Sequence, residues 1–170
     1  MTKSPKKILI QGVSASGKTT FGEKLAHKLQ RPVIMVDEIM WKPNWVYVGD
    51  EETAKKLKKV TSKEAWIIEG YIVGLVRQDV FDQADLILYL DYSGWFSAYR
   101  YMLRFIKHRN DPRPEILGCP EKFSLEFLWR VFKKKEVYKV EKLIRENNYE
   151  SKVVRFKKPS EAKKYLDNLV

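Results

Sequence analysis

A short stretch near the N-terminus, Gly12–Thr19, limits most strongly what this chain can fold into. It fits the pattern of a glycine, four residues, a second glycine, a lysine, and a serine or threonine. The apolar run Ile8–Ile10 precedes it, and apolar residues recur at helical spacing after it. The sequence therefore predicts a strand over residues 6–11, a tight loop, and a helix over residues 18–29.

Each kind of residue in this loop suits the chemistry of phosphate. Glycine permits backbone angles that other residues avoid, and it lets the main chain approach a phosphate closely. Successive N–H groups then face one concavity, to which the start of the helix adds its dipole. Lys18 can reach the β- and γ-phosphates, and the Thr19 hydroxyl can coordinate Mg²⁺. We therefore expect ATP, or a similar nucleotide, and Mg²⁺ as cofactors. The expected nucleotide-binding residues are Gly12, Val13, Ser14, Ala15, Ser16, Gly17, Lys18, Thr19 and Thr20.

Apolar runs alternate with helical patterns along the rest of the chain. Further strands are expected at 33–36, 65–68, 84–90 and 152–156, and further helices at 50–62, 94–108, 124–147 and 160–169. Loops are expected at 39–49 and at the proline-rich stretch 110–120. Continuous apolar runs, in place of strict alternation, indicate a parallel sheet covered on both faces. The prediction is an α/β fold in one domain spanning residues 1–170.

Composition narrows the class of protein. Hydrophobic residues make up 44% and charged residues 32%, which suits a folded domain and excludes a disordered chain. No apolar run reaches the roughly 18 residues of a membrane span, so no membrane partner is expected. The single cysteine, Cys119, fits a reducing cytoplasm. The net charge of +11 suits nucleotides or nucleic acid, although no nucleic-acid-binding motif is present. We interpret the lysines at 55–59 as one solvated helix face.

Acidic residues follow three of the expected strands. In a parallel sheet, ligands bind beyond the carboxyl ends of the strands. Asp37 could hold a Mg²⁺-bound water or orient an acceptor hydroxyl, and a helix cap is its alternative role. Glu69 and Gly70 could border an acceptor or form a plain turn, and Asp91 could support a metal or cap a helix. For these last residues the alternatives stay open.

Aromatic and basic residues complete the candidate site. Trp41 and Trp45 could stack on the ring of an acceptor, or they could pack a loop onto the body of the protein. Four arginines fall in the helix at 94–108 and in the segment after it: Arg100, Arg104, Arg109 and Arg113. Arginines on a closing segment could clamp a transferring phosphate, and a solvated basic face is the alternative. We expect a mobile lid around residues 100–123.

Several stretches match a known family pattern. They are Gly12–Thr20, Asp37–Trp45, Trp66–Tyr71, Arg113-Pro114 and Gly118–Glu121. On these residues the chain resembles the P-loop nucleotide-kinase-like proteins often labelled DNA topology modulation (FlaR-like) proteins, which are relatives of adenylate and shikimate kinases. The resemblance implies a three-layer P-loop NTPase fold. It also implies a five-stranded parallel sheet in the nucleoside-monophosphate-kinase order, helices on both faces and a helical lid that carries arginines. The chain departs from the family at Glu69-Gly70-Tyr71, where the family reads Asp-Gly-Asn.

The resemblance also implies roles for individual residues. Lys18 and Thr19 would bind Mg-nucleotide phosphates, and Asp37 would lie near the metal or the acceptor. The leading hypothesis is a kinase that transfers the γ-phosphoryl group of Mg-ATP to a small acceptor such as a nucleoside or nucleotide. Its expected catalytic residues are Lys18, Asp37, Arg100, Arg104 and Arg113. Its expected metal ligands are Thr19 and Asp37, and its expected acceptor residues are Asp37, Trp41, Trp45, Gly70 and Tyr71. The alternatives are an ATP-switched, nucleic-acid-associated regulator of DNA topology and a simple ATPase.

Overall fold

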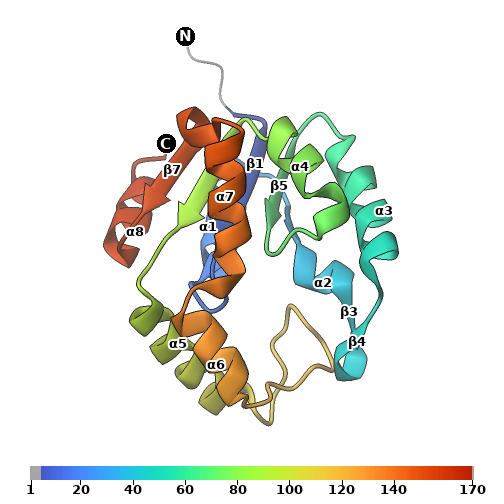
Figure 1. Cartoon of the computed structure of the whole chain (residues 1–170), viewed down its shortest axis with the longest axis vertical. Coiled ribbons are helices and arrows are strands. Elements are labelled where there is room, and N and C mark those ends of the chain that lie inside the picture. The colour runs from blue at the N-terminus through green and yellow to red at the C-terminus, as the bar shows by residue number, and fades with distance from the viewer. Residues whose placement is uncertain (1–4, 170) are drawn as a thin grey trace.

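A parallel sheet forms the centre of the computed structural model, which describes residues 5–169 (Figure 1). Its strands are β1 (Lys7–Gly12), β2 (Val33–Met35), β5 (Trp66–Glu69), β6 (Leu86–Leu90) and β7 (Val153–Phe156). They lie in the order β2-β5-β1-β6-β7, and every neighbouring pair is parallel. The expected five-stranded sheet and its strand order are therefore confirmed. Because β1 lies between β5 and β6, the phosphate loop leaves the middle of the sheet.

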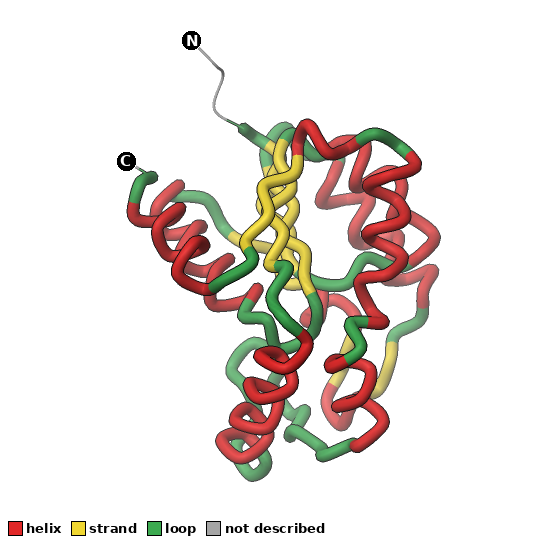
Figure 2. Tube along the Cα trace, turned by 60° about the vertical axis from the view of Figure 1, so that its left-hand side comes forward, coloured by secondary structure: helices red, strands yellow, loops and turns green. Residues whose placement is uncertain are grey.

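Helices cover both faces of this sheet (Figures 1 and 2). They are α1 (Lys18–Leu29), α3 (Asp50–Thr61), α4 (Gly74–Gln83), α7 (Tyr138–Glu146) and α8 (Pro159–Asp167). Alternate residues of β1 explain the layers: Ile8 and Ile10 pack with α1 and α8, whereas Leu9 packs with α3, α4 and α7. A strand buried on both faces must be apolar at successive positions, which accounts for the continuous run in the sequence.

Two further helices, α5 (Gly94–His108) and α6 (Leu125–Phe132), pack against each other beside the sheet (Figure 2). Ser93 caps α5 by accepting a hydrogen bond from the Phe96 amide, and Ser124 caps α6 through the Phe127 amide. The stretch 110–120 between them contains neither helix nor strand, as the prolines predicted. Among residues 5–169 no helix has the length and apolar character needed to cross a bilayer.

The single helix expected over 124–147 is wrong. The chain ends α6 at Phe132, turns at Lys134 with a φ of 55°, and passes through the 3-10 turn η2 (Lys135–Val137) before it enters α7. The two helices have different packing partners. Helix α6 lies against α5, whereas Val140 and Ile144 of α7 are buried against the sheet. A straight helix could not satisfy both surfaces.

Two other expectations also fail. The stretch 39–49 is not a plain loop, because a short helix and a hairpin form there: α2 (Val36–Met40), β3 (Trp41–Lys42), η1 (Pro43–Trp45) and β4 (Val46–Tyr47). Left-handed backbone at Asn44 and Trp45 reverses the chain within this short span. Helix α4 was not predicted, because only its Val76, Val80 and Phe81 are buried and its apolar spacing is weak. The ends of the other elements lie within two residues of the predicted positions.

Candidate phosphate and acceptor site

The phosphate loop joins β1 to α1 in a tight conformation. Gly12, Ala15 and Gly17 have φ angles of 152°, 61° and 97°. The Ser16 amide donates to the Val13 carbonyl at 3.1 Å, and Lys18 Nζ donates to the same oxygen at 3.1 Å. The Val13 side chain is buried with Tyr89, so this residue contributes its backbone to the loop. The lysine is thus held over a loop whose backbone leaves room for an anion.

Gly12 cannot be replaced without strain. A Cβ at this position would lie 2.8 Å from the Leu90 carbonyl oxygen and 2.9 Å from Ser16 Oγ. We expect Gly12→Ala to lower the free energy of unfolding by about 2 kcal/mol, since overpacking of this kind costs about 1–3 kcal/mol. Urea unfolding measures this loss. Gly74→Ala is the matched control, because no atom lies within 4 Å of the Cβ that it adds. Equal stability of the two variants would contradict the geometry.

Two carboxylates lie beside the loop. Thr19 Oγ1 donates to Glu69 Oε1 at 3.0 Å, and Asp37, in the first turn of α2, lines the same cavity as Lys18. Burial raises the pKa of Glu69 to about 6, the charge of Lys18 opposes that shift, and the charge of Asp37 adds to it. The sequence did not decide whether Glu69 borders an acceptor or belongs to a plain turn. The Thr19 contact places it at the site, because β5 pairs with β1.

The oxygen donors fit Mg²⁺ bound together with a nucleotide. Mg²⁺ usually takes one or two protein carboxylates and completes its shell with phosphate oxygens and water. The Thr19 hydroxyl and the carboxylates of Asp37 and Glu69 supply such hard donors. Among residues 5–169, no group of three or more histidine, cysteine or acidic side chains could hold a metal by itself. The arrangement suits a metal that arrives with phosphate.

The raised pKa of Glu69 gives stability a defined pH dependence. Because its pKa in the folded chain is about 6 rather than the ordinary 4.5, folding favours the protonated carboxyl. This contribution is complete below pH 4.5 and is lost as the pH rises through 6. We expect Glu69→Gln to raise the free energy of unfolding by about 2 kcal/mol at pH 7.5 and by much less at pH 4.5. Urea unfolding in EDTA at both pH values checks this, with the exposed Glu23→Gln as control. A pH-independent difference for Glu69→Gln would contradict it.

Asp91 takes neither of its expected roles. Its carboxylate pairs with Lys134 and Lys157 and lies 3.7 Å from Arg155 Nη1. Burial by itself would raise the pKa of Asp91, but the two lysines hold it below its usual range. Ser93, rather than Asp91, caps the following helix, and neither cavity that contains Lys18 is lined by Asp91. Asp91 instead anchors the turn at Lys134.

The arginines divide into three groups. Arg100 lies against the phosphate loop, with its Nη1 2.9 Å from where a Cβ on Gly17 would be. Arg104 and Arg113 share the buried Glu121, at 2.9 and 2.8 Å from its Oε1. Arg109 is exposed and lines no described cavity. Arg100 and Arg104 lie on one helix face, as their spacing predicted, and both line a cavity with Thr19.

The proline-rich segment is fastened to the hairpin. Trp45 Nε1 donates to the Pro120 carbonyl at 2.8 Å, and the Asn44 amide donates to the Gly118 carbonyl at 2.8 Å. The buried Cys119 thiol donates to the Lys42 carbonyl at 3.2 Å, which fits a turn residue rather than a nucleophile. We call these three hydrogen bonds the hairpin clasp. They bring segment 118–120 over one wall of the site.

Three cavities meet at the phosphate loop. One of about 540 Å³ lies between the hairpin and α7, and one of about 340 Å³ lies under α5. Lys18 and Asp37 line both, and Thr19 and Thr20 line the second. A third cavity of about 470 Å³ begins at Gly17 and reaches α8. The site therefore has room for more than one ligand, with Lys18 where two of the cavities adjoin.

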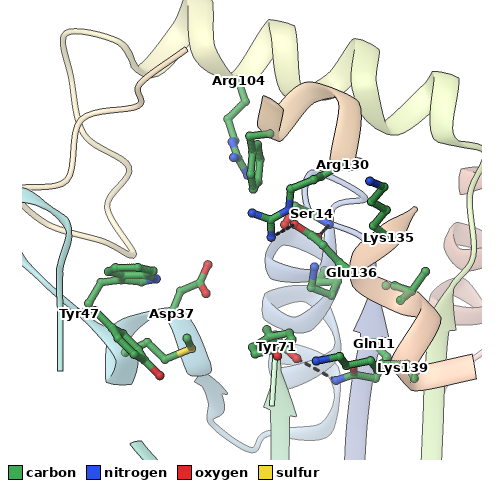
Figure 3. Close-up of a pocket in the computed structure, with 18 of the residues that line it drawn as sticks. Gln11, Ser14, Asp37, Tyr47, Tyr71, Arg104, Arg130, Lys135, Glu136 and Lys139 are labelled. Atoms are coloured by element: carbon green, nitrogen blue, oxygen red, sulfur yellow. Dashed lines mark hydrogen bonds and ion pairs between the residues drawn. The ribbon is translucent and has the colours of Figure 1, made fainter. Parts of the chain in front are cut away.

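The largest cavity has two unlike walls (Figure 3). Its aromatic wall consists of Trp41, Trp45, Tyr47 and Tyr71, with Gly70 beside them. Trp41 packs on Trp45 and Tyr47 with ring centroids 5.6 and 5.3 Å apart, so the tryptophans both pack locally and face the cavity. The opposite wall holds residues that sequence reasoning missed: Arg130, Lys135, Glu136 and Lys139. No motif marks them: Arg130 lies on α6, and the other three follow the break at Lys134.

The strand order, the phosphate loop and the cavities beyond the strand ends define an α/β protein with the fold of the P-loop kinases. No protein-family model matches the sequence, and neither does any curated protein.

Solved structures of small-molecule kinases share this fold. A shikimate kinase from Bacteroides thetaiotaomicron has 17% sequence identity and a TM-score of 0.64, with 98% of this chain and 97% of that chain covered. A shikimate kinase from Acinetobacter baumannii, in complex with shikimate, has 18% identity and a TM-score of 0.64, with 95% and 91% covered. A gluconokinase from Sinorhizobium meliloti 1021 has 18% identity and a TM-score of 0.57, with 97% and 93% covered. The resemblance to shikimate kinases is confirmed at the level of the fold, and the DNA topology modulation label stays a prediction.

Proposed function

We propose that this protein is a phosphotransferase that moves the γ-phosphoryl group of Mg-ATP to a small acceptor. One observation carries the proposal: Lys18 and Asp37 line both the cavity under α5 and the cavity beside the hairpin. A donor phosphate in the first cavity and an acceptor in the second would meet at these two side chains. Positioning of this kind, together with fixed positive charge, supplies most of the catalysis in phosphoryl transfer.

The donor nucleotide would extend from the phosphate loop toward α8. The third cavity begins at Gly17 and is bordered by Arg100 and Pro159, and a base could lie against the planar guanidinium of Arg100. Thr19, Asp37 and Glu69 would hold Mg²⁺, which when bound neutralises charge on the β- and γ-phosphates. Lys18 and the loop amides, apart from that of Ser14, which donates to Glu136, would bind the same phosphates.

The arginines would act from above the phosphates. Arg100 already contacts the loop at Gly17, and Arg104 lines both adjoining cavities. Arg113 also lines both of them, although Glu121 and Glu115 pair with it. Guanidinium groups in these places would stabilise charge that develops on the transferring group. We propose that residues 100–123 close over the site as a lid of a one-domain enzyme.

A coupled assay of ADP formation tests the proposed function. The protein is incubated with Mg-ATP and, separately, with nucleosides, nucleoside monophosphates, shikimate and gluconate. The proposal expects ADP formation that depends on one acceptor and yields a phosphorylated product by mass spectrometry. Equal ADP formation with and without every acceptor would indicate an ATPase. No ADP above a Lys18→Ala control would reject the proposal.

A further inference from the structure

A carboxylate of the protein itself lies on the phosphate loop. Glu136, on η2, accepts a hydrogen bond from the Ser14 amide at 2.8 Å, although the two residues are 122 positions apart in the chain. Its other oxygen is 3.9 Å from Arg130 Nη2, and its side chain is 15% exposed. The space beside the third residue of the loop therefore holds an anion in this structure. Figure 3 shows this contact between Ser14 and Glu136.

The positive charges on the wall around Glu136 outnumber the single negative charge of its carboxylate. Arg104 and Arg113 also line this cavity, but both pair with Glu121, and Arg113 pairs with Glu115 as well. Within residues 5–169 the one ion pair of Arg130 is the 3.9 Å contact with Glu136, and its guanidinium lies 5.7 Å from the centre of the Phe127 ring. For Lys135 and Lys139, which also line this wall, residues 5–169 supply no ion-pair partner. One carboxylate thus faces three cations, and this wall of the cavity favours a further anion.

The wall across the cavity favours a flat ring. Trp41 and Tyr47 come from the hairpin, Tyr71 follows the end of β5, and the cations come from α6, η2 and α7. Figure 3 shows Tyr47 across the cavity from Arg130, Lys135 and Lys139. Tyr47 and Tyr71 are 41% and 43% exposed and both line the cavity, although Arg77 lies over the Tyr71 ring at 5.0 Å and Trp41 packs on Tyr47. Aromatic faces stack on planar rings such as nucleobases, each of which has a π-face.

We infer that Glu136 occupies the position of the acceptor's anionic group, and that the acceptor is a phosphate ester of a compound with a flat ring, as in a nucleoside monophosphate. The inference rests on the proposed function for the donor side and names the acceptor class. A phosphate carries nearly twice the charge of a carboxylate and has three acceptor oxygens. It would displace Glu136 from the Ser14 amide and pair with Arg130, Lys135 and Lys139, while the ring stacks on the aromatic wall.

Isothermal titration calorimetry tests this inference without phosphoryl transfer. Mg-ADP first fills the donor site, and adenosine, guanosine, cytidine and thymidine are then compared with their 5′-monophosphates. At least one monophosphate is expected to bind about tenfold more tightly than its nucleoside. Equal binding within every pair, or binding of shikimate without binding of any monophosphate, would overturn the inference.

Two variants that should change monophosphate affinity in opposite directions distinguish a binding role of these residues from a structural one. Glu136→Gln keeps an oxygen for the Ser14 amide but removes the competing charge, so monophosphate affinity should rise about threefold or more. The double variant Lys135→Gln/Lys139→Gln should lower it about tenfold and leave nucleoside affinity unchanged. Lys142→Gln is the matched control, because Lys142 also lies on α7 but pairs with Glu146 outside the cavity.

Two results with these variants would also overturn the inference: weaker monophosphate binding by Glu136→Gln, or an equal loss in Lys142→Gln and in the double variant. Absence of Mg-ADP binding would reject the proposed function alone. In that case the monophosphates are titrated into the protein without a donor, and the same variants still decide where the anion binds.

Discussion

Lys18→Ala is expected to lower kcat/KM for phosphoryl transfer by about 100- to 1,000-fold. Loss of one fixed donor to a transition-state oxygen has effects of this size. The side chain already lies over the loop, with Nζ 3.1 Å from the Val13 carbonyl, and it lines both adjoining cavities. Nothing else in the loop carries a positive charge. The acceptor-dependent rate is measured at saturating acceptor over a range of Mg-ATP concentrations.

Two controls make this result specific. Lys56→Ala removes the same charge from the exposed face of α3, where Lys56 pairs with Glu52, and should keep full activity. Thermal unfolding of Lys18→Ala should match the wild type, since the single hydrogen bond of Lys18 to the loop contributes little to stability. Activity of Lys18→Ala within about threefold of the wild type would contradict the assigned role, as such a change is under 1 kcal/mol.

Glu121→Gln, which removes a buried charge while keeping the size of the side chain, is expected to lower the free energy of unfolding by about 3–5 kcal/mol. The Glu121 side chain is only 4% exposed, and its Oε1 lies within ion-pair distance of both Arg104 and Arg113. Burial disfavours the charged form of Arg104 and lowers its pKa, while Glu121 acts in the opposite direction. Without that carboxylate, Arg104 loses its ion pair and Arg113 keeps only Glu115. Breaking a buried pair costs about 3–5 kcal/mol.

Urea and thermal unfolding measure this effect. For a chain of this size a loss of about 3 kcal/mol lowers Tm by roughly 6–12 °C. Glu126→Gln, an exposed glutamate on α6, is the control and should change the free energy of unfolding by less than about 0.5 kcal/mol. A loss below about 1 kcal/mol for Glu121→Gln would show that water, rather than Glu121, solvates the arginines.

The strand, loop and helix around Gly12–Thr19 could be predicted because neighbouring residues determine them. The position of Asp37 followed from a general rule, since parallel strands end at one edge of the sheet, and it does line a cavity with Lys18. The partners of other residues could not be predicted in this way. The pairing of Thr19 with Glu69 depends on β5 lying beside β1, which no local pattern encodes.

The wall of the largest cavity that carries Arg130, Lys135 and Lys139 could not be predicted from the sequence for a related reason. A run of three lysines, Lys133–Lys135, reads as part of a surface helix, and the sequence offered no glycine or proline to mark a break. The break is stabilised from a distance, because Lys134 pairs with the buried Asp91 at the end of β6. That ion pair turns the chain, so that Glu136 reaches the Ser14 amide. Tertiary contacts thus override local preference here.

The hairpin clasp has a consequence for the order in which molecules enter and leave. Its three hydrogen bonds join the hairpin, which carries Trp41, Trp45 and Tyr47, to residues 118–120 of the proposed lid. A movement that opens the lid must therefore move the hairpin with it or break the hairpin clasp. If the nucleotide and the acceptor each bind more tightly when the lid is closed, each would raise the affinity of the protein for the other. By thermodynamic linkage, the two effects must be equal in size.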